Sequence, residues 1–268
     1  MQEQFSIRRE DEFDSESASL ALLLGGEYFT YAIHDTDGNA VKELKRFPIQ
    51  QLNSQKLNVV LQNNEVLQRR FQRIVTAFDF DTYSLLPVDL NKGDNTALLY
   101  MNGAGQQDHI ITEVISRWGI ANVYSIPYSL LNWTVSNFPS SKFWHVQSVL
   151  IKNISKNLEA GCLNVDFGDK KFIITATHEE KLLISKSYFY KAPADVLFYL
   201  LKICESFDLK QEEVQVNLTG LIDKESGMFR TLYEYFLNVN FLPATWDQPG
   251  DYPSHYFTLL NQISRCEL

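Results

Sequence analysis

A repeated pattern of three short strands limits the folds open to this chain more than any other feature. Residues 22–47 (LLLGGEYFTYAIHDTDGNAVKELKRF) and 164–189 (NVDFGDKKFIITATHEEKLLISKSYF) each read as a strand ending in glycine, a tight turn, a strand ending in histidine, a second turn and a third strand. The two copies begin 142 residues apart, at positions 22 and 164. The pattern therefore predicts an internal duplication of an antiparallel three-stranded meander.

Helices and further strands are predicted after each copy. The predicted helices cover residues 52–75, 129–138, 192–209, 225–237 and 254–263, and the predicted strands cover residues 109–119, 213–223 and 238–243. Apolar runs at 75–80 and 82–90 predict a strand pair, and the run at 96–101 predicts a strand. The Gly-x-Gly that follows, Gly103 and Gly105, lacks the third glycine of a dinucleotide fingerprint and predicts a turn.

This layout resembles the RNase H-like half-domain, and two such halves in one chain resemble the actin-like ATPase superfamily. That superfamily includes actin, the Hsp70 ATPase domain, sugar kinases and the pilus-assembly protein PilM. The segments YSLLPVDL, NVYSIPYSLL and YPSHYFTLLNQISRCE resemble an uncharacterised bacterial family of the same superfamily. The resemblance implies an α/β fold with duplicated RNase H-like halves, the actin-like ATPase fold, around a central cleft.

Three regions are expected along the chain. Residues 1–17 are rich in charged side chains, and we expect a disordered acidic tail there. The first RNase H-like half is expected at residues 18–155, with subdomain insertions at about residues 76–145. The second half is expected at residues 156–268.

The resemblance also implies a candidate nucleotide site. Active members of the superfamily hold nucleotide between the halves, with a phosphate loop from the first hairpin of each half and a glycine-rich adenosine motif. Asp166 and Gly168 match the second phosphate motif, and Thr219 and Gly220 match part of the adenosine motif. A carboxylate is needed to hold magnesium or its waters, and glycine lets the backbone approach phosphate closely. These four residues are the cofactor-binding candidates, and Mg-ATP is the alternative to no cofactor.

The first copy departs from this pattern. Aligning Gly26 with Gly168 places Leu24 opposite Asp166, so the first loop carries a leucine where an active member has its aspartate. A leucine side chain cannot hold a magnesium ion or its waters. This departure disfavours ATP hydrolysis.

A second departure lies in the adenosine motif, where Leu221 and Ile222 are expected to crowd a purine. The preferred prediction is therefore a pseudo-ATPase with no catalytic residues. We expect a non-enzymatic cytoplasmic adaptor or scaffold that binds a protein or peptide partner. The alternative is a nucleotide-binding switch, kinase or ATPase that uses Asp166 and Gly168 as its phosphate loop.

Charge and composition exclude other classes. A net charge of −9 and a pI near 5.1 argue against a nucleic-acid partner, which needs a basic face. The most basic run, RRFQR at residues 69–73, is predicted to be the solvated face of a helix. No stretch approaches the roughly 18 apolar residues of a membrane span, and the first residues lack the apolar run of a signal peptide. A cytoplasmic location is expected.

The remaining reactive side chains predict no chemistry. The three cysteines, Cys162, Cys204 and Cys266, are widely spaced and odd in number, so neither a disulfide framework nor a metal site is indicated. His178, Glu179 and Glu180 follow one another at a hairpin tip, where consecutive side chains are expected to point apart into water. Aromatic residues make up 13% of the chain, and we expect most of them in the core. Any rings that reach the surface favour a protein-binding groove.

Overall fold

The computed structural model divides the chain into two compact units, each described here by itself. It describes residues 2–10, 12–35, 37, 40–91, 93, 95–154, 161–247 and 250–266. Unit 1 consists of Met1–Val149, Thr245–Asp251 and Leu260–Leu268, and unit 2 consists of Leu150–Ala244 and Tyr252–Leu259. The last two segments of unit 1 fall in the region predicted for the second half. The boundary predicted between residues 155 and 156 lies outside the described residues, as does part of the second turn of the first copy.

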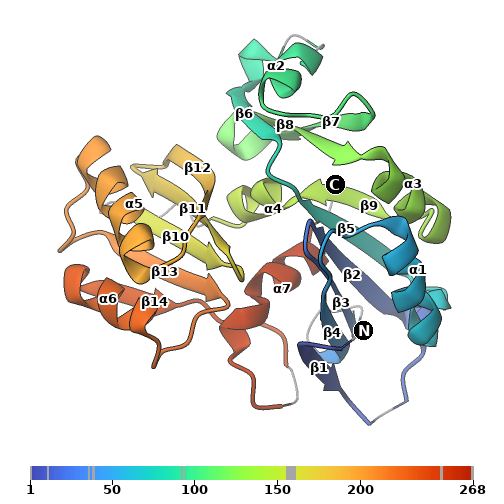
Figure 1. The fold of residues 1–268 in the computed structure, drawn as a ribbon. Helices are drawn as coiled ribbons and strands as arrows, with labels where there is room; N and C mark the ends of the chain where they lie inside the picture. The colour runs from blue at the N-terminus through green and yellow to red at the C-terminus, as the bar shows by residue number, and fades with distance from the viewer. Residues whose placement is uncertain are drawn as a thin grey trace. The chain divides into compact units, whose positions relative to one another are not determined.

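Unit 1 is built on a six-stranded sheet with the order β1-β4-β3-β2-β5-β9 (Figure 1). Its strands are β1 (Phe5–Arg8), β2 (Ala18–Gly25), β3 (Tyr28–Asp35), β4 (Val41–Pro48), β5 (Arg73–Asp79) and β9 (Lys142–His145). The strands β2, β3 and β4 form the predicted antiparallel meander, and β5 and β9 add parallel strands. Helices α1 (Ser54–Asn63) and α3 (Tyr128–Asn137) contribute to the core on one face of this sheet.

Helix α1 is shorter than the predicted helix over residues 52–75. The side chain of Asn53 caps it by accepting a hydrogen bond from the backbone N–H of Lys56 at 3.0 Å. The helix ends at Asn63, a 3-10 helix follows at Glu65–Gln68, and β5 already begins at Arg73. The basic run at 69–73 therefore connects a 3-10 helix to a strand and is not the face of a helix, because the apolar residues after Asn63 continue into the sheet.

A three-stranded sheet with the order β6-β8-β7 is inserted between β5 and β9. Its strands are β6 (Tyr83–Pro87), β7 (Asp108–Ile115) and β8 (Ile120–Pro127), and α2 (Thr96–Met101) packs beside it. Two predictions are wrong here. The run at 96–101 is a helix, since a short apolar run fits either element. The runs at 75–80 and 82–90 do not pair with each other, because β5 joins the six-stranded sheet and β6 pairs with β8.

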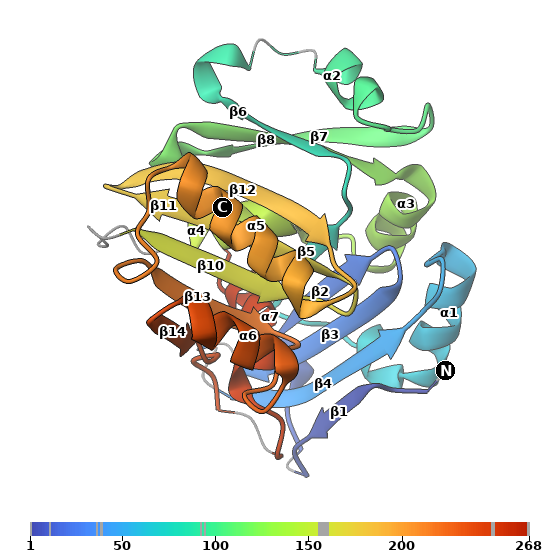
Figure 2. The ribbon, with the colours of Figure 1, turned by 60° about the vertical axis from the view of Figure 1, so that its left-hand side comes forward.

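Unit 2 repeats the central order of unit 1 in a five-stranded sheet, β12-β11-β10-β13-β14 (Figure 2). Its strands are β10 (Cys162–Phe167), β11 (Lys171–His178), β12 (Lys181–Phe189), β13 (Gln215–Gly220) and β14 (Asn238–Phe241). Helices α5 (Pro193–Ser206) and α6 (Gly227–Tyr235) cover one face and supply core side chains such as Val196 and Leu232. Two further helices, α4 (Val146–Lys152) and α7 (Thr258–Ser264), contain residues of both units.

The first seventeen residues differ from the predicted disordered tail. Strand β1 pairs antiparallel with β4, and Phe5 and Ile7 are buried while Ser6 and Arg8 are exposed. A 3-10 helix follows at Ser15–Ser17. The alternating apolar residues of this short strand supply the burial that orders it, although charged residues dominate the local composition.

Candidate functional site

Asp166 and Thr219 form a hydrogen-bonded pair in unit 2. They are directly opposite each other on the parallel strands β10 and β13, so both side chains lie on the same face of the sheet. The Thr219 hydroxyl donates to Asp166 Oδ1 at 2.6 Å. Both residues are buried, on the face opposite the core residues Val165 and Phe167. The structure thus brings two of the four candidate residues into direct contact.

Gly168 lies in a hairpin whose backbone groups are already engaged. Its N–H donates to the carbonyl of Lys171 at 2.8 Å, which leaves Asp169 and Lys170 as a two-residue tip. Its carbonyl accepts a hydrogen bond from the Tyr190 hydroxyl at 3.0 Å. A phosphate loop presents such an N–H to its ligand. Here the N–H of Gly168 closes the turn.

Gly220 is required by the backbone around it. Its φ is +77°, and a Cβ atom added there would lie 2.1 Å from the carbonyl oxygen of Phe167. That carbonyl also accepts a hydrogen bond from the N–H of Leu221 at 2.7 Å. The close approach of β10 and β13 therefore accounts for the glycine without any ligand.

The side chain of Ile222, predicted to crowd a purine, packs into the core of unit 2. Its carbonyl oxygen lies 2.7 Å from Nε2 of His255, which links the end of β13 to the 3-10 helix at Ser254–Phe257. Burial lowers the pKa of His255 below its ordinary value. This imidazole is therefore a neutral, structural group near pH 7.

The strand registers correct the alignment of the two copies by one residue. In unit 1, Leu24 pairs with Phe29 and both face the core. In unit 2, Phe167 pairs with Phe172 and both face the core. Because neighbouring residues on a strand point to opposite faces, Leu24 corresponds to Phe167 and not to Asp166.

A second landmark gives the same offset of 143 residues. The register shifts between Ile33 and His34 where β3 meets β4, and between Ala176 and Thr177 where β11 meets β12. Such irregularities mark fixed positions in a sheet. The two copies are therefore offset by 143 residues. With this offset, Gly25 corresponds to Gly168.

With this offset, Leu23 corresponds to Asp166 and Ala77 corresponds to Thr219. Leu23 and Ala77 are directly opposite each other on β2 and β5, and both are buried. The prediction that the first copy has a leucine in place of the aspartate thus holds for Leu23, and the choice of Leu24 was wrong. The first copy has an apolar pair where the second copy has a hydrogen-bonded polar pair.

A second polar pair, which the sequence analysis did not predict, lies beside the first hairpin. The Tyr28 hydroxyl donates to Asp79 Oδ2 at 2.5 Å, and the guanidinium of Arg46 lies 3.9 Å from the centre of the Tyr28 ring. Asp79 ends β5, and an acidic residue at the carboxyl end of a parallel strand is a signal that could have found it. Its carboxylate is engaged within unit 1.

The other reactive groups behave as structural residues. Burial raises the pKa of Cys162 to about 12 and that of Cys204 to about 11, so both remain thiols at neutral pH. Glu179 and Glu180 form the turn between β11 and β12 and have positive φ values of 47° and 62°. Among the described residues, no group of three or more His, Cys, Asp or Glu side chains could hold a metal ion. Nor does any helix in the described ranges have the length and apolarity to span a bilayer.

The family model described as "Protein of unknown function (DUF3822)" matches residues 9–239. The chain belongs to this family. No curated protein matches the sequence. The match covers both copies of the meander, and it agrees with the predicted resemblance to an uncharacterised family.

Solved structures identify the fold of this DUF3822 member. A protein from Bacteroides thetaiotaomicron with an actin-like ATPase fold and unknown function is similar over 94% of this chain and 97% of that chain, with a TM-score of 0.79 and 16% identity. The PilM–PilN type IV pilus biogenesis complex matches 92% of this chain and 97% of that chain, with a TM-score of 0.54 and 12% identity. The ethanolamine utilization protein EutJ from Carboxydothermus hydrogenoformans matches 96% and 92%, with a TM-score of 0.53 and 9% identity. The predicted actin-like ATPase fold is confirmed.

Proposed function

We propose that this protein is a scaffold that binds an extended segment of a protein partner and does not hydrolyse ATP. The observation that carries the second half of the proposal is the pairing of Leu23 with Ala77 where an active site needs a carboxylate. The closed hairpin at Gly168 supports it, because that N–H is donated to Lys171. The hairpin tip of unit 1 also carries the exposed Glu27, which repels a polyphosphate.

The edge strand β7 is the surface that we assign to the partner. The three sheets have six edge strands, of which β1, β9 and β14 have four residues each and β6 has five. The nine-residue β12 carries Lys181 and Lys186, which oppose strand addition. The eight-residue β7 (DHIITEVI) has no lysine, arginine, proline or glycine. It is the long edge without these protective features.

The register shows which backbone groups of β7 face outward. The N–H of Ser125 on β8 donates to the carbonyl of Thr82, next to β6, and Ser125 is opposite Ile110. In an antiparallel pair the N–H and C=O of one residue point to the same side, so those of Ile110 point away from β8. Alternation then directs the peptide groups of Thr112 and Val114 outward as well. The backbone N–H and C=O groups of these three residues can form hydrogen bonds with the backbone of an added strand.

The chemistry around β7 indicates the kind of segment that fits. Val114 is half exposed, and α2, which packs against β6 and β8 of the same sheet, exposes Tyr100 and Met101. The strand carries no lysine or arginine, in a protein with a net charge of −9. An extended segment with apolar side chains and a lysine or arginine complements this surface. The protein–protein complex of the structurally similar PilM supports the same class of function.

Selection from a displayed peptide library tests the binding surface directly. Peptides selected on the wild type are expected to lose binding to Thr112→Pro, which removes an outward N–H but no hydrogen bond to β8. Thr112→Ser is the matched control and keeps the ladder. Unchanged binding by Thr112→Pro would contradict the assignment to β7.

A second candidate function is a nucleotide-binding switch, kinase or ATPase that uses Asp166 and Gly168. The hydrogen bond between Asp166 and Thr219 favours it, because the pair has the residue types that a magnesium–nucleotide site uses. Thermal unfolding with and without Mg-ATP separates the two. A ligand at 100 times its Kd adds about 2.7 kcal/mol, which raises Tm by about 5 °C or more at this length. We expect no shift that depends on Asp166, and a shift lost in Asp166→Ala would replace the scaffold proposal by the switch.

A further inference from the structure

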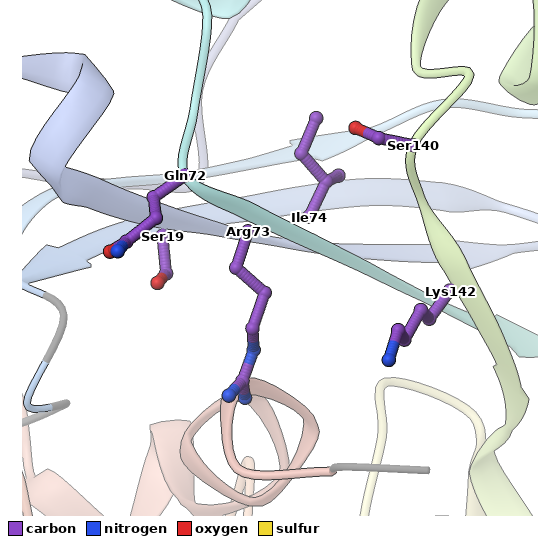
Figure 3. Close-up of a pocket in the computed structure, with 6 residues that line it drawn as sticks. All are labelled: Ser19, Gln72, Arg73, Ile74, Ser140 and Lys142. Atoms are coloured by element: carbon purple, nitrogen blue, oxygen red, sulfur yellow. The ribbon is translucent and has the colours of Figure 1, made fainter.

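A hollow of about 480 Å³ lies within unit 1, where β2, β5 and β9 begin (Figure 3). It is lined by Ser19, Gln72, Arg73, Ile74, Ser140 and Lys142. This volume is within the range of about 300–1,000 Å³ that is usual for small-molecule sites. The hairpin loop of unit 1 is at the other end of β2, so this hollow is separate from the region of the predicted phosphate loop.

The strand registers bring the two cations of the hollow together. Ser19 is directly opposite Arg73, and Val75 is directly opposite Lys142, in two parallel strand pairs. Paired residues share a face, so Ser19, Arg73 and Lys142 all lie on the face opposite the core, as Figure 3 shows. From the spacing of strands and residues, the Cα atoms of Arg73 and Lys142 are about 8 Å apart.

The lining has the composition of an anion site. It contains a guanidinium, an ammonium, two hydroxyls and an amide, and none of its six residues is acidic. This is a local reversal of charge in a protein with a net charge of −9. Arginine and lysine spaced in this way donate charge-assisted hydrogen bonds to carboxylate or phosphate oxygens.

Arg73 is held in position by the rest of unit 1. Its guanidinium donates to the carbonyl of Ser264 at the end of α7. Burial lowers the pKa of His34, and the positive charges of Arg73 and Arg265 lower it further, while Asp35 acts in the opposite direction. His34 is opposite Ser19 on β3, and so it extends the row of polar groups across the sheet. The positive potential on this face therefore has several sources within one unit.

We propose that this hollow binds a small anion that carries two or more carboxylate or phosphate groups. Arg73 and Lys142 contact separate oxyanion groups, and the hydroxyl of Ser19, which lies on the same face, donates to a remaining oxygen. The ligand enters from the exposed side at Lys142 and Ser140. The site is independent of the scaffold function proposed for β7, and either can fail without the other.

Isothermal titration with the sodium salts of phosphate, pyrophosphate and citrate, against sodium chloride at equal ionic strength, tests this site. We expect the wild type to bind pyrophosphate or citrate and the Kd to rise about tenfold or more in Lys142→Met, which loses one charged donor. Lys224→Met, which removes an exposed lysine in unit 2, is the matched control and should bind like the wild type. Ser140→Asp adds a carboxylate at an exposed position of the rim and should also weaken binding.

Two results would overturn the proposal: no binding of any of the three anions by the wild type, or equal affinity in the wild type, Lys142→Met and Ser140→Asp. The same variants separate this site from the predicted phosphate loop. A thermal shift with Mg-ATP that is lost in Lys142→Met and kept in Asp166→Ala would assign ATP to the hollow. The opposite pattern would assign it to the hairpin of unit 2.

Discussion

The first hairpin of unit 1 and the first hairpin of unit 2 have the same strand register and opposite chemistry. Unit 1 places Leu23 against Ala77, and unit 2 places Asp166 against Thr219, at matched positions of β2–β5 and β10–β13. All four side chains are buried. The comparison shows that the two copies share the same strand pairing. They differ at one pair of buried side chains, which is apolar in unit 1 and hydrogen-bonded in unit 2.

The largest expected effect comes from Gly220, where the backbone of unit 2 leaves no room for a Cβ atom. Gly220→Ala places a Cβ atom against the Phe167 carbonyl at a positive φ, whereas unit 1 has Phe78 at the matched position. We expect a loss of about 4 kcal/mol in the free energy of unfolding, in the exceptional range for one substitution. Urea unfolding measures it. Gly227→Ala, where the added Cβ meets nothing within 4 Å, is the control, and an equal loss in both variants would refute the argument.

Converting unit 1 to the chemistry of unit 2 gives the next largest effect. Leu23→Asp buries a carboxylate beside Ala77, which offers no hydroxyl, and removes an apolar side chain. We expect a loss of about 3 kcal/mol in stability. The double variant Leu23→Asp/Ala77→Thr should recover about 1 kcal/mol, because it reproduces in unit 1 the hydrogen bond that Thr219 donates to Asp166 in unit 2. A double variant no more stable than the single one would break the proposed equivalence of the two sites.

Removing the hydroxyl from unit 2 has a smaller effect. Thr219→Val leaves Asp166 Oδ1 without the 2.6 Å hydrogen bond and preserves the shape of the side chain. We expect a loss of about 1–2 kcal/mol by urea unfolding. Ala77→Val, the matched change in the apolar pair of unit 1, tests for steric effects alone. The hydrogen-bond interpretation requires that Thr219→Val lose its effect when Asp166 is also replaced by Ala.

The smallest effect concerns pH and distinguishes His34 of unit 1 from Thr177, its match in unit 2. Burial lowers the pKa of His34 below its ordinary value of 6.5. The unfolded chain then binds more protons, so His34 contributes stability above pH 6.5 that is lost as the pH falls. His34→Thr should reduce the pH dependence of Tm between pH 7.5 and pH 5. His255, with a pKa lowered in the same direction, should preserve part of it. An unchanged profile in His34→Thr would exclude this role.

The sequence predicted the duplication because period-two alternation and turn residues mark a meander well. The one-residue error in matching the copies arose at Gly25 and Gly26, two adjacent glycines that fit the same turn. The two alignments differ in whether Leu24 lies on the core face of the sheet or on the opposite face. The core face is the one that packs against α1 and α3, and the sequence alone does not show which face that is. The sequence could therefore give the strands but not the correspondence of Leu23 with Asp166.

Short elements with mixed signals were predicted least well. Phe5 and Ile7 of β1 carry the alternation of a strand, but the surrounding charges masked it. The six-residue α2 is too short for helical periodicity to separate it from a strand. For the candidate site, the motif grouped Asp166 with Thr219, and the two side chains are hydrogen-bonded. It could not show that the N–H of Gly168 is taken by Lys171, because that depends on the hairpin register.

Unit 1 is assembled from both ends of the chain, and this has a consequence for its synthesis. The backbone N–H of Val41 donates to the carbonyl of Asp247, and Arg73 donates to Ser264, so two early strands depend on segments that follow most of unit 2 in the sequence. At about 5–20 residues per second, the 95 residues from Leu150 to Ala244 alone delay the later segments of unit 1 by roughly 5–20 s after Val149 has been added. Throughout that delay β4 and β5 lack these two hydrogen-bond partners, and unit 2 lacks its own segment Tyr252–Leu259. Neither unit can therefore complete its native contacts until the residues after Ala244 have been synthesised.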